Sequence, residues 1–167
     1  MNKQILELES ILKDLAASHE RLLVLLRSKR AALRQADRER VIDLCAEENQ
    51  QVHTISGLEQ RRLKLVADLT LALEPDAPQP LNLEALARRL PEPACGRLLV
   101  LRSRLREKME QARREAGATR QATERLLQHI QGLIQTVGGM MAGVATYAPS
   151  RPNATEKMNF RTFSTTG

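Results

Sequence analysis

At 167 residues the chain is long enough to bury the core of one domain, and its composition, rich in leucine, alanine, arginine, glutamate and glutamine and free of tryptophan, favours helices. The two cysteines, Cys45 and Cys95, exclude a disulfide-rich framework and indicate free thiols in a reducing compartment. The formal net charge of +6 suits an acidic partner, although solvated helix faces account for it as well. The amino-terminal residues lack the apolar segment of a signal peptide, and no stretch approaches the length of a membrane span, so we expect a cytoplasmic protein.

Hydrophobic spacing predicts a helical hairpin in the first part of the chain, which contains no proline before Pro75. Apolar residues alternate at intervals of three and four, which predicts a helix over about residues 2–33 with a coiled-coil seam. That seam comprises Ile5, Leu8, Leu12, Leu15, His19, Leu22 and Leu26. Asp37 is a suitable cap for a second helix over 38–73, whose apolar residues form a looser stripe.

A linker and two further helices are expected after the hairpin. The segment 74–80 contains three prolines and cannot be helical throughout. Asn82 can cap a short helix over 83–90, which two more prolines close off. A last long helix is expected over about 94–137, with a break at the two glycines that follow.

The predicted fold is therefore all-α. We expect residues 1–137 to form an elongated antiparallel bundle of three long helices, coiled-coil-like in its hairpin, with one short extra helix. We expect residues 138–167, which are rich in small and polar side chains, to form a flexible, disordered docking tail.

The end of the last predicted helix carries an apolar face that is broader than one seam requires. Its residues are Leu126, Leu127, Ile130, Leu133, Ile134 and Val137, followed by Met140 and Met141. Flexible methionines suit adaptable binding surfaces, and an amphipathic helix of this kind can bind a partner helix. The alternative is that these residues are buried within the same bundle.

All three aromatic residues, Tyr147, Phe160 and Phe163, fall in the last 21 residues, within the predicted tail. Aromatic side chains carry the largest apolar surfaces, and a folded core normally takes them first. Their placement predicts a tail that is displayed for docking to another protein. The alternative for Tyr147 is that it folds back on the two methionines and caps the bundle.

Catalytic patterns are missing from the sequence. The three histidines, His19, His53 and His129, lie on three different predicted helices, and the seam position of His19 suits a residue that fixes register. No glycine-rich phosphate loop, paired-cysteine motif or nucleophile elbow occurs. We therefore expect a non-enzyme without a cofactor or metal.

A basic cluster in the last predicted helix raises the possibility of nucleic-acid binding. It comprises Arg97, Arg102, Arg104, Arg106, Lys108, Arg113 and Arg114. Such a cluster can contact phosphates, but glutamates interrupt it and no aromatic residue is interleaved to stack on bases. We therefore do not expect nucleic acid as the partner.

The last predicted helix contains TRQATERLLQHIQGLIQTV from Thr119 to Val137, and ATYAPSRP follows from Ala145 to Pro152. Together with the hairpin and the proline-containing linker, this layout resembles the FlgN-type flagellar export chaperones. The resemblance implies a small cytosolic chaperone of type III export that holds the hook-filament junction proteins FlgK and FlgL before secretion.

The resemblance further implies that the chaperone docks at the flagellar export gate, FlhA, for which Tyr147 is the matching residue. The apolar face of the last helix is then the client-binding site. The alternative from another class is a structural coiled-coil adaptor that buries this helix in a stable homo-oligomer.

Overall fold

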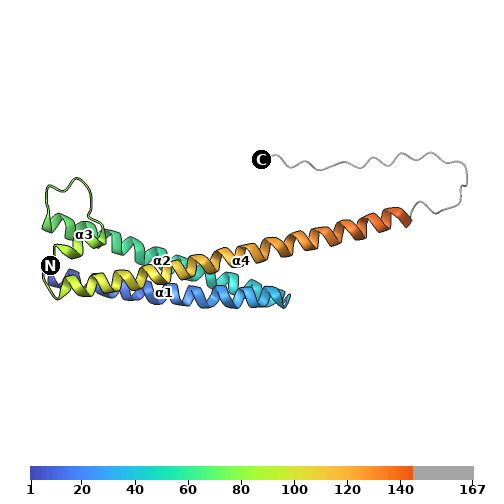
Figure 1. The fold of residues 1–167 in the computed structure, drawn as a ribbon, viewed down its shortest axis with the longest axis horizontal. Coiled ribbons are helices and arrows are strands. Elements are labelled where there is room, and N and C mark those ends of the chain that lie inside the picture. The colour runs from blue at the N-terminus through green and yellow to red at the C-terminus, as the bar shows by residue number, and fades with distance from the viewer. Residues whose placement is uncertain (145–167) are drawn as a thin grey trace, which may run out of the picture. The chain divides into compact units, whose positions relative to one another are not determined.

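The computed structural model describes the backbone of residues 1–144 and the side chains of residues 1–139. These residues form four helices and no strand: α1 (Asn2–Arg34), α2 (Arg38–Leu73), α3 (Leu83–Arg88) and α4 (Ala94–Val144) (Figure 1). The predicted helical class is therefore confirmed for this part of the chain. The chain forms two compact units, Met1–Leu127 and a second unit that begins at Gln128.

The turn between α1 and α2 combines a helix stop with a helix start. The N–H of Asp37 donates to the carbonyl of Ala32 at 3.0 Å, and the N–H of Ala36 donates to Leu33 at 3.3 Å, as in a Schellman motif. Ala36 takes the left-handed conformation that this motif requires, with φ of 55°. The carboxylate of Asp37 then accepts a hydrogen bond from the N–H of Arg40 at 3.0 Å and caps α2, as the sequence predicts.

The two helices joined by this turn run antiparallel. Near the turn, Lys29 forms an ion pair with Glu48. Further along, the amide of Gln51 donates to the carbonyl of Ser18 at 3.2 Å. Residue numbers therefore increase along α1 while those of the facing residues of α2 decrease. The two helices are antiparallel, which confirms the predicted hairpin.

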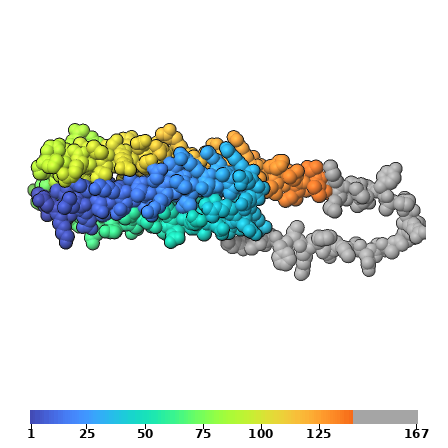
Figure 2. Space-filling model, turned by 90° about the horizontal axis from the view of Figure 1, so that it is seen from below, coloured from blue at the N-terminus to red at the C-terminus, as the bar shows by residue number. Residues whose placement is uncertain are grey.

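Helix α4 packs on α1 within the first unit, and the two helices run in the same direction. Nε of Arg97 donates to Glu9 at 2.9 Å, Lys108 forms an ion pair with Glu20, and the hydroxyl of Thr119 lies 3.4 Å from the carbonyl of Leu26. Figure 2 shows α1 in blue between α2 and the yellow part of α4. Helix α1 is therefore the element that both other long helices contact.

Because α1 contacts both α2 and α4, it buries more residues than those of the predicted seam. Ile5, Leu8, Leu12, Leu15 and Leu26 are buried as expected, whereas His19 and Leu22 are only half-buried. Ile11, Ala16 and Leu23, which lie outside the seam, are buried as well. A helix with neighbours on two sides needs a wider apolar face than a two-stranded seam provides.

The linker and α3 close one end of the core. The hydroxyl of Thr70 donates to the carbonyl of Val66 at 2.7 Å and accepts a hydrogen bond from the N–H of Leu81 at 3.1 Å. Asn82 caps α3, because its side-chain oxygen accepts from the N–H of Ala85 at 2.9 Å. Helix α3 ends at Arg88, two residues earlier than predicted, and buries Leu86 completely.

The predicted helix end at Val137 is wrong. Helix α4 continues through Gly138 and Gly139 to Val144. Each glycine lowers helix stability by only about 1 kcal/mol relative to alanine, so two of them at the end of a long helix do not force a break. No helix among residues 1–144 combines the length and the apolar character needed to cross a membrane.

Candidate protein-binding site

The apolar side chains predicted to bind a client lie on helix α4. In the second unit, Ile130, Leu133, Ile134 and Val137 are 42%, 53%, 66% and 56% exposed. In the first unit, Leu127 is 54% exposed and Leu126 is half-buried. The side chains of Met140 and Met141, and the whole of Tyr147, lie outside the described residues.

Helical spacing places these side chains on one face. Along the sequence, Leu126, Ile130, Leu133 and Val137 follow one another at intervals of four, three and four residues, which is the spacing of one stripe on a helix. Leu127 and Ile134 are seven residues apart and border this stripe. We refer to these six residues as the apolar face of α4.

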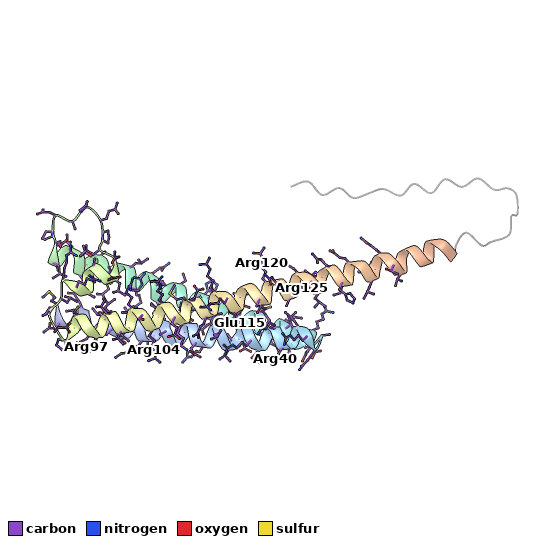
Figure 3. The ribbon with its side chains drawn as sticks, in the orientation of Figure 1. Arg40, Arg97, Arg104, Glu115, Arg120 and Arg125 are labelled. Carbon is purple, nitrogen blue, oxygen red and sulfur yellow. The ribbon has the colours of Figure 1, made fainter. Side chains whose placement is uncertain are left out.

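The apolar face is surrounded by uncharged residues. From Leu126 to Val144 the chain contains no aspartate, glutamate, lysine or arginine, and its polar side chains are those of glutamine, histidine and threonine. The last charged residues before it are Arg125, which is exposed, and Glu124, which pairs with Arg120 at 2.9 Å (Figure 3). Recognition at this face must therefore depend on apolar burial and neutral hydrogen bonds.

Such a face can bind an amphipathic helix of another protein. Partner helices are recognised by apolar residues spaced three, four and seven positions apart, which is the spacing found here. Complete burial of a leucine or isoleucine side chain contributes about 1.5–3 kcal/mol. Large exposed apolar patches are uncommon on proteins that have no partner.

A polar contact that is not evident from the sequence holds α4 against α1. Glu115 is only 12% exposed in its side chain, and it lies 3.0 Å from Nη2 of Arg30 and 3.9 Å from Nε of Arg27. Ala112 and Thr119, on the same part of α4, are buried. Hydrophobic spacing gives no sign of the ion pair, because all of its residues are charged.

His19 lines a cavity of about 400 Å³ between α1 and α4, together with Leu22, Met109 and Ala112. Both of its ring nitrogens are buried without a hydrogen-bond partner among the described residues. Burial lowers the pKa of His19, and the negative charge of Glu59 opposes this shift. In the described part of the chain, no group of three or more histidine, cysteine or acidic residues is arranged to hold a metal ion.

Much of the basic cluster forms ion pairs that hold the helices together. Arg97 pairs with Glu9 on α1, Lys108 with Glu20 on α1, and Arg102 with Glu84 on α3. A fourth member, Arg114, pairs with Glu110 on α4 itself at 3.3 Å. Most of these cations therefore have a structural partner, which weakens the case for a phosphate-binding surface.

Comparison with known proteins gives one result. A family model described as FlgN protein matches residues 1–152. No curated protein and no solved structure matches the chain. The match includes all four described helices, the apolar face of α4 and Tyr147.

Proposed function

Because the chain belongs to the FlgN family of flagellar export chaperones, we propose that its clients are the hook-filament junction proteins FlgK and FlgL. The apolar face of α4 binds them, prevents their premature assembly, and allows their delivery to the type III export gate. The observation that carries this proposal is the exposure of Leu127, Leu133, Ile134 and Val137, each more than half accessible on one helix.

The chemistry of the face suits this role. A subunit that awaits export has to be kept from assembling, and the segments that drive assembly are amphipathic helices. An apolar helix on the chaperone can cover such a segment by helix pairing. Release at the export gate has to be possible, which favours a modest, adaptable interface.

Docking at the gate is assigned to Tyr147. This residue follows α4 in the sequence and lies within the family match. An aromatic side chain is a common anchor at protein interfaces because it buries a large area at low entropic cost. On this proposal FlhA is the partner, and the client and the gate use different residues of the chaperone.

The proposed activity consists of binding alone, in the cytoplasm, without catalysis or a cofactor. His19, His53 and His129 lie on α1, α2 and α4. Among residues 126–137 the one acid–base side chain is His129, so the apolar face is not accompanied by a pair of such groups.

Calorimetric titration of the full-length chain with purified FlgK and FlgL tests the proposal. The change Ile130→Asp with Leu133→Asp should abolish binding, because it places two charges in the interface. The matched control is Ile42→Asp with Leu63→Asp, which alters two apolar residues on α2 that are 58% and 56% exposed. The control should bind normally.

Equal binding by the wild-type chain and the Ile130→Asp, Leu133→Asp variant would refute the assignment of the client site. The structural adaptor gives a different result. In that case the wild-type chain forms a stable homo-oligomer that the same variant dissociates, as light scattering would show, and FlgK and FlgL do not bind.

A further inference from the structure

A groove between α1 and α4 in the first unit carries several cationic side chains among those that line it. Its volume is about 530 Å³. The lining residues are Lys13, Ala16, Ala17, Glu20 and Arg21 from α1, and Leu101, Arg104 and Lys108 from α4. The groove thus combines four cations with a small apolar surface and one carboxylate.

The one carboxylate of the groove is already engaged. Glu20 forms an ion pair with Lys108. The hydrogen bond from Lys108 lowers the pKa of the Glu20 carboxyl, and the nearby charges of Arg27 and Arg104 act in the same direction against the opposing effect of desolvation. Glu20 is therefore ionised, and its direct ion-pair partner is Lys108, while Arg27 and Arg104 act on it at longer range.

The other three cations have no such partner. Lys13, Arg21 and Arg104 form no ion pair within residues 1–139, and all three side chains are exposed. Figure 3 shows Arg104 on the part of α4 that lies along α1. Three like charges around one groove repel one another and create a positive potential that attracts an anion.

The groove lies between two ion pairs that join α1 and α4. On one side of it, Arg97 pairs with Glu9 at 2.9 Å, and on the other side Arg30 pairs with Glu115 at 3.0 Å. Charges are therefore matched at these two pairs, whereas three cations meet around the groove.

We propose that this groove binds an acidic segment of a partner protein. Carboxylates of that segment pair with Lys13, Arg21 and Arg104, and its small apolar side chains lie against Ala16, Ala17 and Leu101. The surface is built from residues other than those of the apolar face, so this partner is distinct from the client proposed above. The chain is then an adaptor with two separate binding surfaces.

A protein segment fits the groove better than a nucleic acid does. Among the described residues the groove offers no aromatic side chain on which a base can stack. The apolar part of the lining suits the side chains of a peptide. Charge complementarity of this kind mainly sets the association rate and the choice of partner.

The test uses the full-length chain and a fluorescein-labelled synthetic peptide built from glutamate and alanine, with binding followed by fluorescence anisotropy. The variant Lys13→Gln with Arg104→Gln removes two groove charges. The matched control, Arg38→Gln with Lys64→Gln, removes two exposed charges from α2. Circular dichroism verifies that both variants remain helical, since glutamine is a good helix former.

We expect the groove variant to bind the peptide about fivefold more weakly than the wild type, and the control to differ by less than about twofold. Binding should weaken as ionic strength rises from about 0.01 M to about 0.15 M, and the same peptide with glutamine in place of glutamate should not bind.

Other outcomes overturn the proposal. No binding of the acidic peptide at low ionic strength excludes an acidic segment as the occupant. Equal losses in the groove and control variants show attraction by net charge alone. Tighter, groove-dependent binding of a single-stranded oligonucleotide assigns the groove to nucleic acid, and groove-dependent self-association assigns it to a second copy of the chain.

Discussion

Glu115 on α4 lies 3.0 Å from Arg30 on α1, and its side chain is only 12% exposed. One of its oxygens, Oε1, has no well-directed hydrogen bond, so the contact is held mainly by charge. A nearly buried carboxylate depends strongly on its counter-ion, because removal of the partner leaves the charge uncompensated. This pair therefore fixes α4 against α1 where the apolar contacts between them are small.

We predict that Arg30→Ala lowers the free energy of unfolding by about 1–3 kcal/mol, because it leaves the carboxylate of Glu115 without its nearest cation. Urea denaturation measures this effect. The control Arg114→Ala breaks an exposed pair with Glu110 on the same helix and should change stability by less than about 0.5 kcal/mol. Similar effects of the two changes would show that Glu115 is solvated.

Ala36→Gly should stabilise the chain by about 0.5–1 kcal/mol. Ala36 has a φ of 55°, which strains an alanine and suits a glycine. The control Ala46→Gly introduces glycine at an exposed position within α2 and should destabilise by about 1 kcal/mol. Chemical denaturation measures the change in unfolding free energy, which should be positive for Ala36→Gly and negative for Ala46→Gly. A loss of stability in both variants would contradict the left-handed conformation of Ala36.

Stability should decrease as the pH falls through the range in which His19 titrates. Burial lowers the pKa of His19 in the folded state below its ordinary value of 6.5, so the unfolded chain binds the proton more readily. The stabilising contribution is present above pH of about 6.5 and is lost as the pH falls through the lower, folded-state pKa. Glu59 on α2 opposes this shift, and Arg106, Glu110 and Arg113 on α4 line the same cavity.

The change His19→Leu isolates this effect. It removes two buried ring nitrogens that have no hydrogen-bond partner among the described residues, so the variant should be more stable and its melting temperature should depend less on pH. His53→Leu, at an exposed position on α2, serves as the control and should retain the wild-type pH dependence. Parallel curves for wild type and His19→Leu would exclude His19 as the group responsible.

Client binding at the apolar face should respond little to salt. No charged residue occurs between Leu126 and Val144, so few ion pairs are available to be screened. Calorimetry at about 0.01 M and about 0.15 M ionic strength should give client affinities within about twofold of each other. A steep loss of affinity would indicate that charged residues elsewhere in the chain carry the client contact.

Tyr147→Ala should impair docking at the export gate without changing stability or client binding. If Tyr147 is the anchor for FlhA, the variant keeps the melting temperature and client affinity of the wild type, but secretion of the client and motility decline. A loss of about 1 kcal/mol in stability would instead assign the tyrosine to the bundle. Normal secretion by the variant would remove Tyr147 from the docking step.

Local signals in the sequence predicted local structure well. Asp37 and Asn82 both cap the helices that they were expected to cap, and the seam that begins at Ile5 is largely buried. These features depend on a few neighbouring residues, so they can be recognised without knowledge of the rest of the fold. The left-handed turn at Ala36 was missed because its sequence lacks the glycine that usually marks such a position.

Features that depend on residues far apart in the chain were not predictable. The ion pair between Arg30 and Glu115 requires the register of α4 on α1, which hydrophobic spacing does not fix where the contact residues are small. The exposure of the apolar face is consistent with its width, because one coiled-coil seam would bury fewer apolar residues than this face contains. Its role in binding a client stays a prediction.

The contacts of α1 with both α2 and α4 have a consequence for the order of folding. Lys29 and Glu48 in the hairpin are 19 residues apart, whereas Arg97 and Glu9 are 88 residues apart. Closure of the longer loop costs about 1.3 kcal/mol more in chain entropy, so the hairpin forms first and α4 then docks on α1. During synthesis, α1 and α2 can therefore pair before the apolar face has left the ribosome, which shortens the time for which this face is exposed on an unfolded chain.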